Sequence, residues 1–263
     1  MLARIRVGIG RFYKKKRDDK KDGLVNMAKK KTNVEQWIER EKLHPNIREA
    51  LENASRYFAR IDALTVNMLE AIYGQESSFG ILLRKRGMDG AAGYFHIDKK
   101  TAGQYYLIVS KENDQRFDID YASITAARYL TDLNRYFGKT TILAEDRLTV
   151  PVKDVMMRKK FVLAAYNMGA SYIAHAQQLA QEAGKDPANW DEVKGYLEVA
   201  GVKADTAEKG REYVVDVLKN EAEFAEKSSA DKKIKNKRPG KTKGLCAKGH
   251  WITKDHHHIF ICG

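Results

Sequence analysis

Apolar side chains recur at steps of three and four residues from NVEQWIEREKL (33–43) to about residue 220, and this spacing places them on one face of an α-helix. After Pro45, which suits a first helical turn, the spacing continues through Ile47, Leu51, Ala54 and Phe58 to Ile61. Further helices are predicted from about residue 65 to residue 76 and over 98–109, 119–137, 153–168, 170–183, 189–200 and 206–220. The middle of the chain is therefore predicted to be all-α.

Two parts of the chain depart from this helical pattern. Residues 80–93 contain four glycines and are predicted to form a loop suited to the wall of a cleft. Near the C-terminus, HWITKDHHHIFI (250–261) alternates apolar and polar residues around a Lys-Asp pair, which predicts a possible small β-hairpin. Alternating runs of β-branched residues are rare before residue 240, so a sheet of any size is not expected.

The net charge of +13 is concentrated at the two ends of the chain. Residues 1–32 carry a net charge of +9, residues 33–226 carry −4 and residues 227–263 carry +8. A mildly acidic middle argues against a groove built to bind nucleic acid, and no nucleic-acid specificity is predicted. Basic arms of this kind either solubilise a protein as flexible segments or attach it to a polyanion, a cell wall or an assembly partner.

Length and composition set the domain organisation. A chain of 263 residues that is 43% hydrophobic can bury one sizeable core. No apolar run approaches the roughly 18 residues that span a bilayer, so we expect a soluble protein without a transmembrane segment. The predicted organisation is a basic leader with a short helix (1–44), a helical domain (45–222), a basic linker (223–244) and a short C-terminal tail (245–263).

The N-terminal segment does not resemble a secretory signal. Arg4, Arg6 and Arg11 interrupt its apolar residues, and no A-x-A-like cleavage site follows a hydrophobic stretch. We therefore expect synthesis in the cytoplasm without a secretory signal.

Cysteine and histidine gather in the tail. Cys246 and Cys262 are the two cysteines of the chain, so no disulfide framework supports the main domain. His250 and His256–His258 are of a type that binds zinc in other proteins. Their spacing matches none of the usual zinc-finger patterns, however, and histidines on a hairpin can simply face solvent. We predict no metal and no cofactor.

Glu76 lies on the apolar face of the helix predicted from about residue 65. Val66, Leu69 and Ile72 or Tyr73 precede it on that face. Desolvation favours the protonated form of a carboxyl group, and a protonated carboxyl can act as the general acid that cleavage of a glycosidic bond needs. The same spacing also fits a glutamate at a helix end that turns to solvent, so the pattern alone leaves both interpretations open.

Four short motifs add specificity: ESSFG (76–80), GYFHI (93–97), AAYNMG (164–169) and REYVVDVL (211–218). In this order they resemble the motif series of the soluble lytic transglycosylases, glycoside hydrolase family twenty-three, which have the goose-type lysozyme fold. RFDIDYASITAARYLTDLNRYFG (116–138) also resembles the helix between the second and third motifs of that family. The resemblance covers about residues 60–220. It implies an all-α, lysozyme-like multi-helix domain, here with flexible basic N- and C-terminal arms.

The resemblance implies that Glu76 is the single catalytic acid and base. In such an enzyme it would protonate the bond between N-acetylmuramic acid and N-acetylglucosamine and then accept the proton of the C6 hydroxyl group, which yields a 1,6-anhydro product without consuming water. Phe79 would pack beneath the first motif, and core packing is the alternative for Tyr94 and Phe95. The residues implied to bind substrate are Ser77, Gly93, Tyr94, Phe95, His96, Tyr166, Asn167 and Tyr213. Tyr166 and Asn167 would orient Glu76 and the sugar.

Departures from the family pattern keep two other functions open. His96 replaces the usual Gln and would add a pH dependence, and Met168 replaces the usual Ala. If Asp89 or Asp98 reached the cleft at the roughly 6.5–9.5 Å separation of inverting glycosidases, a hydrolytic lysozyme would result. The alternative from another class is a non-catalytic structural or wall-binding virion protein.

The C-terminal segment KGHWITKDHHHIFI (248–261) resembles a short segment at the ends of bacteriophage head and virion proteins. The match is short. It suggests a phage-encoded enzyme that reaches the cell wall in a virion; transport through a conjugation apparatus or release at lysis are alternatives. The expected partners are peptidoglycan glycan strands and, through the basic arms, virion or secretion-machinery proteins.

Overall fold

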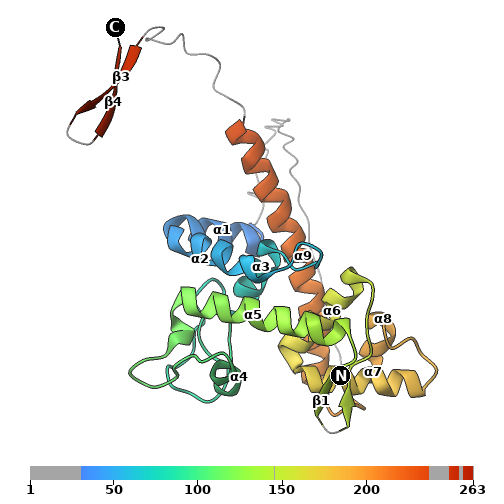
Figure 1. Cartoon of the computed structure of the whole chain (residues 1–263). Coiled ribbons are helices and arrows are strands. Elements are labelled where there is room, and N and C mark those ends of the chain that lie inside the picture. Colours follow the sequence, from blue (N-terminus) through green and yellow to red (C-terminus); the bar gives the residue numbers. More distant parts are fainter. Residues whose placement is uncertain (1–30, 145, 237–248, 255–256, 263) are drawn as a thin grey trace, which may run out of the picture. The chain divides into compact units, whose positions relative to one another are not determined.

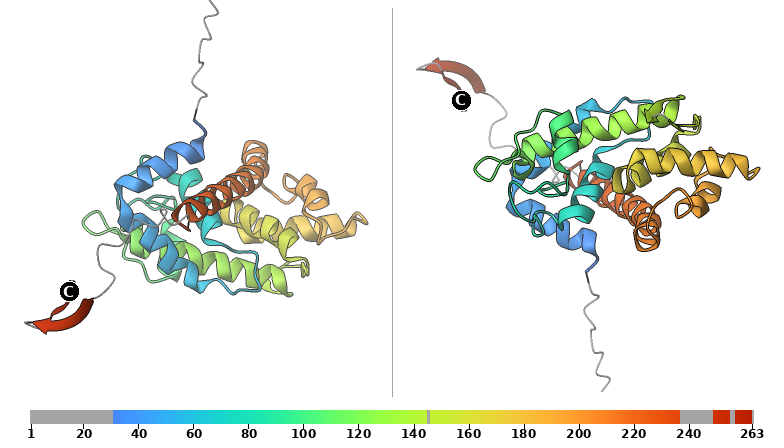
Figure 2. Two further views of the ribbon diagram at one scale, coloured as in Figure 1. Left: turned by 90° about the horizontal axis from the view of Figure 1, so that it is seen from above. Right: turned by 90° about the horizontal axis from the view of Figure 1, so that it is seen from below.

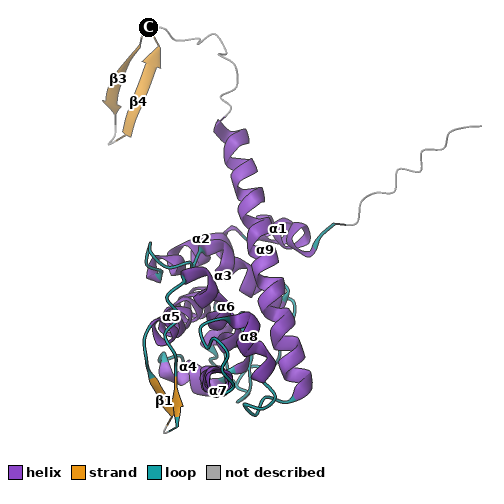
Figure 3. Ribbon diagram, turned by 90° about the vertical axis from the view of Figure 1, so that its right-hand side faces the viewer, coloured by secondary structure: helices purple, strands orange, loops and turns teal. Residues whose placement is uncertain are grey.

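The computed structural model describes residues 31–144, 146–236, 249–254 and 257–262 (Figure 1). Most of these residues are helical, as the colouring in Figure 3 shows, and the prediction of an all-α fold is confirmed. The α-helices are α1 (Asn33–Leu43), α2 (Pro45–Ala54), α3 (Val66–Ser77), α4 (Lys99–Gln104), α5 (Ile119–Gly138), α6 (Val155–Met168), α7 (Ala170–Glu182), α8 (Trp190–Val193) and α9 (Ala204–Asn236). Short 3₁₀ helices are η1 (Ser55–Tyr57), η2 (Gln115–Phe117) and η3 (Lys194–Tyr196).

Polar side chains at the helix starts explain where several helices begin. The side chain of Thr65 accepts a hydrogen bond from the backbone N–H of Met68 and caps α3. Asp98 caps α4 in the same way, and Asp154 caps α6. Such caps satisfy backbone donors that have no partner within the helix. The first residues of these helices are therefore determined locally.

Helix α3 lies in the middle of the helical body. It packs along α9, while α5 packs against α2 and α6, and α6 packs against α9 and α7. Figure 2 shows α1 and α2 at one end of this body and α7 and α8 at the other. Every residue of α3 from Met68 to Gly74 is buried. A helix that is buried on all sides holds its last turn, which contains Glu76, in one position.

Aromatic packing extends the core beyond the predicted domain boundaries. Trp37 of α1 stacks on Phe79 and on Phe224 of α9, and it lies so close to α3 that a Cβ atom at Gly74 would come within 2.5 Å of its ring. Phe224 is 1% exposed. α1 therefore packs into the core, N-terminal to the boundary predicted at residue 45, and α9 extends to Asn236, past the boundary predicted at residue 222. Residues 1–30 and 237–248 lie outside the described residues.

Three predicted helices end earlier than expected. α2 ends at Ala54 and gives way to η1, and Ile61 is 85% exposed. α4 ends at Gln104 because Tyr106 adopts a positive φ of 64° and the chain turns back, with the backbone N–H of Leu107 donating to Ala102. The predicted helix 189–200 is divided between α8 and η3. Periodic spacing thus indicates which face of a segment is buried more reliably than where the segment ends.

Two hairpins accompany the helices. β3 (Gly249–Lys254) and β4 (His257–Cys262) pair antiparallel with Trp251 opposite Phe260, so the predicted C-terminal hairpin is confirmed. β1 (Ile142–Ala144) and β2 (Arg147–Leu148) form a second, shorter antiparallel pair, which was not predicted because strands of two or three residues show no pattern. Within the described ranges, no helix combines the length and the apolar character that crossing a membrane requires.

A buried carboxyl group on α3 makes the stability of this fold depend on pH. Glu70 is 1% exposed and accepts a hydrogen bond from Arg48 at 3.0 Å. Burial, and after it the charge of Glu41, raises the pKa of Glu70 to about 8. Because the folded protein holds this proton more tightly than the unfolded chain does, the free energy of unfolding falls as the pH rises from the ordinary range of a glutamate through about 8.

Glu70→Gln should remove this pH dependence. The amide oxygen still accepts from Arg48, but the side chain no longer titrates. The free energy of unfolding, measured with urea, should fall between about pH 6 and about pH 9 in the wild type. In the variant this fall should be smaller by about 1–3 kcal/mol. Glu182→Gln, at an exposed position at the end of α7, is the matched control and should behave as the wild type. Equal losses in all three proteins would contradict the assignment.

Candidate functional site

The motif ESSFG ends α3 and presents Glu76 at the surface of the core. The side chain of Glu76 is 13% exposed. Ser77 is fully buried; its hydroxyl donates to the carbonyl of Tyr73 and accepts from the backbone N–H of Gly80. Ser78 and Phe79 have positive φ angles of 48° and 56°, so the chain turns sharply away from the helix axis directly after the glutamate. The last turn of α3 therefore places Glu76 directly before a sharp bend in the chain.

Tyr213 of α9 contacts the carboxyl group of Glu76 directly. Its phenol donates a hydrogen bond of 2.8 Å to Oε1 of Glu76, and the tyrosine is 5% exposed. Burial, and after it the negative charge of Glu76, raises the pKa of Tyr213 well above its ordinary value. The phenol therefore stays protonated and remains a neutral donor to the carboxylate.

His96 contacts the other oxygen of the same carboxyl group. Its Nδ1 atom lies 3.2 Å from Oε2 of Glu76, while its Nε2 atom lies 2.7 Å from the carbonyl oxygen of Leu82. The residue adopts a positive φ of 45°, a conformation that is uncommon for residues other than glycine. The surrounding loop thus holds the imidazole between a backbone acceptor and the carboxyl group.

Arg116 holds the loop that carries His96. It is fully buried, and its guanidinium group donates to the carboxylate of Asp114 and to the backbone carbonyls of Met88, Gly90 and Ile97. Burial alone would raise the pKa of Asp114, but hydrogen bonds from Arg116 and from the backbone N–H of Gly87 lower it below its ordinary value. This buried ion pair and its hydrogen bonds therefore join the loop 87–97 to η2, which directly precedes α5. Arg116 is the first residue of the segment 116–138 that resembles the family, but no role was predicted for it, because no sequence pattern marks an arginine that binds backbone carbonyls.

Gly93 lies where the loop passes closest to Arg116. It has a positive φ of 79°, and a Cβ atom at this position would collide with the backbone carbonyl of Arg116. That carbonyl accepts a hydrogen bond of 3.0 Å from the backbone N–H of Tyr94. Gly93 is thus required by the approach of two backbone segments and does not contact substrate with a side chain.

Gly93→Ala should lower the free energy of unfolding by on the order of 1–3 kcal/mol, because the alanine is strained at this φ and displaces a backbone segment. Gly103→Ala is the matched control: Gly103 lies within α4, and nothing comes within 4 Å of the added Cβ. It should be neutral or stabilising by about 0.5–1 kcal/mol, since alanine favours helix. Thermal unfolding of the two variants checks both values, and equal stability would contradict the assignment.

A small cavity opens beside His96. Its volume is about 210 Å³, and the residues that line it are His96, Ile97, Asp98, Thr101, Tyr129, Tyr166, Asn167, Met168 and Gly169. Asn167 is exposed at this cavity, whereas both carboxylate oxygens of Asp98 accept hydrogen bonds from Thr101. The cavity is therefore lined by neutral hydrogen-bonding groups and one carboxylate that already has partners. Such a lining suits a polar, uncharged ligand.

The structure brings Glu76, His96 and Tyr213 together. The phenol of Tyr166 donates to the carbonyl of Phe95 at 2.9 Å, and its predicted role of orienting Glu76 and the sugar stays a prediction. Burial raises the pKa of this phenol well above its ordinary value. Asn167 lines the cavity, which leaves its predicted role open.

Three residues predicted to bind substrate have no side chain available for it. Ser77, Gly93 and Phe95 are buried and shape the helix end and the loop. Tyr94 is half-buried against Tyr73, while Phe79 packs on Trp37 and Tyr73 beneath the motif, as predicted.

Asp89 does not join the site. Its side chain is 88% exposed and pairs with Lys99. Asp98 reaches the cavity, but with both oxygens engaged by Thr101. Neither aspartate therefore offers Glu76 a free carboxylate partner.

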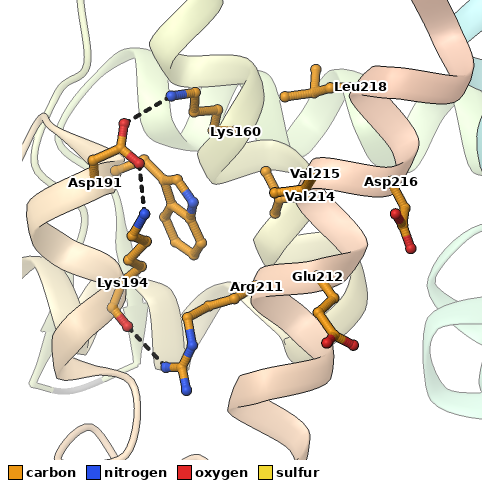
Figure 4. A pocket seen from close by; sticks show the side chains of 10 residues that line it. Lys160, Asp191, Lys194, Arg211, Glu212, Val214, Val215, Asp216 and Leu218 are labelled. Carbon is orange, nitrogen blue, oxygen red and sulfur yellow. Dashed lines mark hydrogen bonds and ion pairs between the residues drawn. The ribbon is translucent and has the colours of Figure 1, made fainter.

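A larger cavity, of about 550 Å³, lies elsewhere, between α6, α8 and α9. Figure 4 shows Asp191 bridging Lys160 and Lys194 at one wall and Val214, Val215 and Leu218 along α9. None of the residues that contact the carboxyl group of Glu76 lines this larger cavity.

Among the described side chains, no group of three or more His, Cys, Asp or Glu residues is placed to hold a metal ion. The side chains of the Cys- and His-containing tail are not among those described.

Comparison with known proteins gives a consistent result. The family described as "Transglycosylase SLT domain" matches residues 54–189, a range that includes Glu76, His96 and Asn167 but ends before Tyr213. "Membrane-bound lytic murein transglycosylase F" of Desulfosudis oleivorans is 26% identical over 149 residues, which cover 57% of this chain and 27% of that protein. "Membrane-bound lytic murein transglycosylase F 2" of Alkalilimnicola ehrlichii is 26% identical over 164 residues, which cover 61% and 32%. The chain thus spans about a third or less of the length of these relatives.

Proposed function

The chain belongs to the transglycosylase SLT domain family, and we propose on this basis that it cleaves the glycan strands of peptidoglycan as a lytic transglycosylase with Glu76 as acid and base. The observation that carries the proposal is the arrangement around this one carboxyl group. Tyr213 and His96 each contact one of its oxygens, and His96 also lines the small cavity. A carboxyl group held at both oxygens beside a polar cavity is equipped to transfer a proton to a bound sugar.

The proposed reaction needs a single acid and base. Glu76 protonates the oxygen that joins N-acetylmuramic acid to N-acetylglucosamine, and the bond from this oxygen to the anomeric carbon breaks. The C6 hydroxyl oxygen of the same muramic acid then bonds to that carbon, and its proton passes to Glu76. The product is a 1,6-anhydro end, and the enzyme regains the proton that it donated. An attack within one sugar has a high effective concentration and requires no second carboxylate to activate water.

The side chains around Glu76 support this division of roles. Tyr213 donates to Oε1 and thereby stabilises the carboxylate that forms when the proton leaves. Asn167 offers an exposed amide at the cavity, where we place a polar substituent of the sugar. Asp98 caps α4 and accepts hydrogen bonds from Thr101 through both oxygens, which favours a structural role for this carboxylate over that of a water-activating base in the hydrolytic alternative.

Mass spectrometry of the fragments released from purified cell walls tests the proposal. Anhydro ends on the muramic acid are expected. Reducing ends would replace the proposal with a hydrolytic lysozyme, and intact walls after incubation with folded protein would replace it with a non-catalytic wall-binding protein.

We further propose that a phage particle delivers the protein to the cell wall. The support is the net charge of +9 and +8 on residues 1–32 and 227–263, which suits attachment to an assembly partner, together with the short C-terminal resemblance to virion proteins. Protein sequencing of purified particles should detect the chain. Its presence in cell lysates together with its absence from particles would contradict this route.

A further inference from the structure

The contact between His96 and Leu82 determines where the imidazole carries hydrogen. A backbone carbonyl oxygen can only accept a hydrogen bond, so the Nε2 atom that lies 2.7 Å from it must carry a hydrogen. In the neutral ring, Nδ1 then has a lone pair and no hydrogen. This lone pair faces Oε2 of Glu76 at 3.2 Å. The loop thus forces the acceptor side of a neutral imidazole toward the carboxyl group.

We propose that Glu76 and His96 share one proton between Oε2 and Nδ1, and that the enzyme is active only while the pair holds this single proton. The proposal rests on the proposed function for its activity, but the shared proton is a property of the uncomplexed protein. With one proton present, either the carboxyl group donates to Nδ1 or the imidazolium donates to Oε2, and both arrangements satisfy the contact. His96 is then a positioning residue that acts through Glu76.

The other two proton counts are less favourable. Without a proton, two lone pairs face each other across 3.2 Å, one of them on an anion. With two protons, the imidazolium can still donate to the neutral carboxyl group, but the attraction between opposite charges is lost and the site carries a net positive charge. Only the singly protonated pair has an acid proton and an otherwise uncharged site.

The other titratable groups that face the pair do not supply this proton. Tyr213 from α9 and Tyr166 from α6 have pKa values raised well above the ordinary range by burial and then by Glu76. Tyr129 from α5 has its pKa raised to about 12, by burial and then by Asp98. Asp98, at the start of α4, accepts hydrogen bonds from Thr101 through both oxygens. The phenols therefore remain neutral and do not supply the shared proton.

The proton count stays constant through the proposed reaction. The pair begins with one proton, which moves from Oε2 to the leaving oxygen. The proton of the C6 hydroxyl group then returns to Oε2 or Nδ1, so the pair again holds one. A second proton on His96 would place a cation near an anomeric carbon that becomes positive in the transition state, and it would weaken Glu76 as the base that accepts the C6 proton. Activity therefore falls on the acid side when the second proton binds and on the alkaline side when the shared proton is lost.

His96→Gln tests the proposal through the pH dependence of the rate. Glutamine keeps a donor for Leu82 but does not titrate, so no cation forms at low pH and no facing lone pair retains the proton at high pH. On purified cell walls the acid limb of the rate profile should therefore disappear, and the alkaline limb should move to lower pH by on the order of one unit. His96→Asn should change both limbs in the same way, and asparagine tolerates the positive φ at this position. Unshifted limbs with a lower maximum would overturn the proposal.

Tyr213→Phe is the matched control, because it removes one hydrogen bond to the same carboxyl group without removing a group that titrates in this range. Loss of a donor to the carboxylate favours the protonated form. The alkaline limb of this variant should therefore move to higher pH, opposite to the shift of His96→Gln. A shift of both variants in the same direction would show that any loss of contact to Glu76 moves the profile, and would overturn the specific role of His96.

Nuclear magnetic resonance of the imidazole nitrogens tests the shared proton without any activity. The His96 signals, identified by their absence in His96→Gln, should show hydrogen on Nε2 in the neutral ring. Their pH dependence should change in Glu76→Gln, since the anionic partner is lost. Identical titration curves in wild type and Glu76→Gln would overturn the shared proton. If the wild type leaves cell walls intact while these curves differ, the proposed function fails and the shared proton stands.

Discussion

Glu76→Gln is expected to reduce the rate of peptidoglycan cleavage by about 10²–10⁴-fold, because glutamine cannot donate or accept the proton that the reaction transfers. The fold should be unaffected, since the amide oxygen still accepts from Tyr213 and the amide group donates to Nδ1 of His96. Release of soluble fragments from purified cell walls measures the rate, and thermal unfolding measures the fold.

Glu182→Gln is the matched control for this experiment. It makes the same chemical change at an exposed position at the end of α7 and should keep the wild-type rate. If Glu76→Gln clears cell walls as well as the parent does, Glu76 is not the acid, and any cleavage must come from another group. A rate lost together with the fold would instead assign Glu76 a structural role.

Arg116→Met is expected to lower the free energy of unfolding by about 3–5 kcal/mol, because it leaves the buried carboxylate of Asp114 without its partner. Three backbone carbonyls also lose their donor. For a domain of this size the melting temperature should fall by on the order of 10 °C. Since these carbonyls belong to the loop of His96, cleavage of cell walls should also decrease below the melting transition.

Two further variants separate the loss of the ion pair from the loss of a charge. Arg135→Met removes an arginine that is 58% exposed and pairs with Asp132 one turn away on α5, and it should cost about 1 kcal/mol or less. Combining Arg116→Met with Asp114→Asn removes the uncompensated charge and should restore part of the lost stability. If Arg116→Met unfolds at the same temperature as Arg135→Met, the buried network does not stabilise the loop.

Short-range rules were sufficient for a large part of the fold. The spacing of apolar residues identified the buried faces of α3, α5, α6 and α7, and the caps at Thr65, Asp98 and Asp154 mark helix starts with side chains that lie within three residues of the group they satisfy. Where a distant residue supplies the stabilising contact, the same rules failed. α9 continues past residue 222 because Phe224 is buried against Trp37, and these two residues lie far apart in sequence.

The candidate site, like the fold, was only partly predictable from the sequence. The order of the four motifs was enough to single out Glu76, His96 and Tyr213, because motif order is a property of the sequence. It assigned Ser77 and Phe95 to the substrate, whereas tertiary packing buries both. The motifs also gave no role to Arg116. Several of its partners are backbone carbonyls, and because every residue type has one, the sequence does not show where they lie.

The sequence by itself determined the helical class, the buried faces of α3, α5, α6 and α7 and the choice of Glu76 as the candidate acid. Only the tertiary structure decided the surroundings of that carboxyl group. It places the phenol of Tyr213 on one oxygen of Glu76 and Nδ1 of His96 beside the other, and it places Nε2 of His96 beside the carbonyl of Leu82. Periodicity and motifs depend only on the order of side-chain types along the chain. Which nitrogen of the His96 imidazole donates a hydrogen bond depends instead on the backbone atom that folding brings next to it, here the carbonyl oxygen of Leu82.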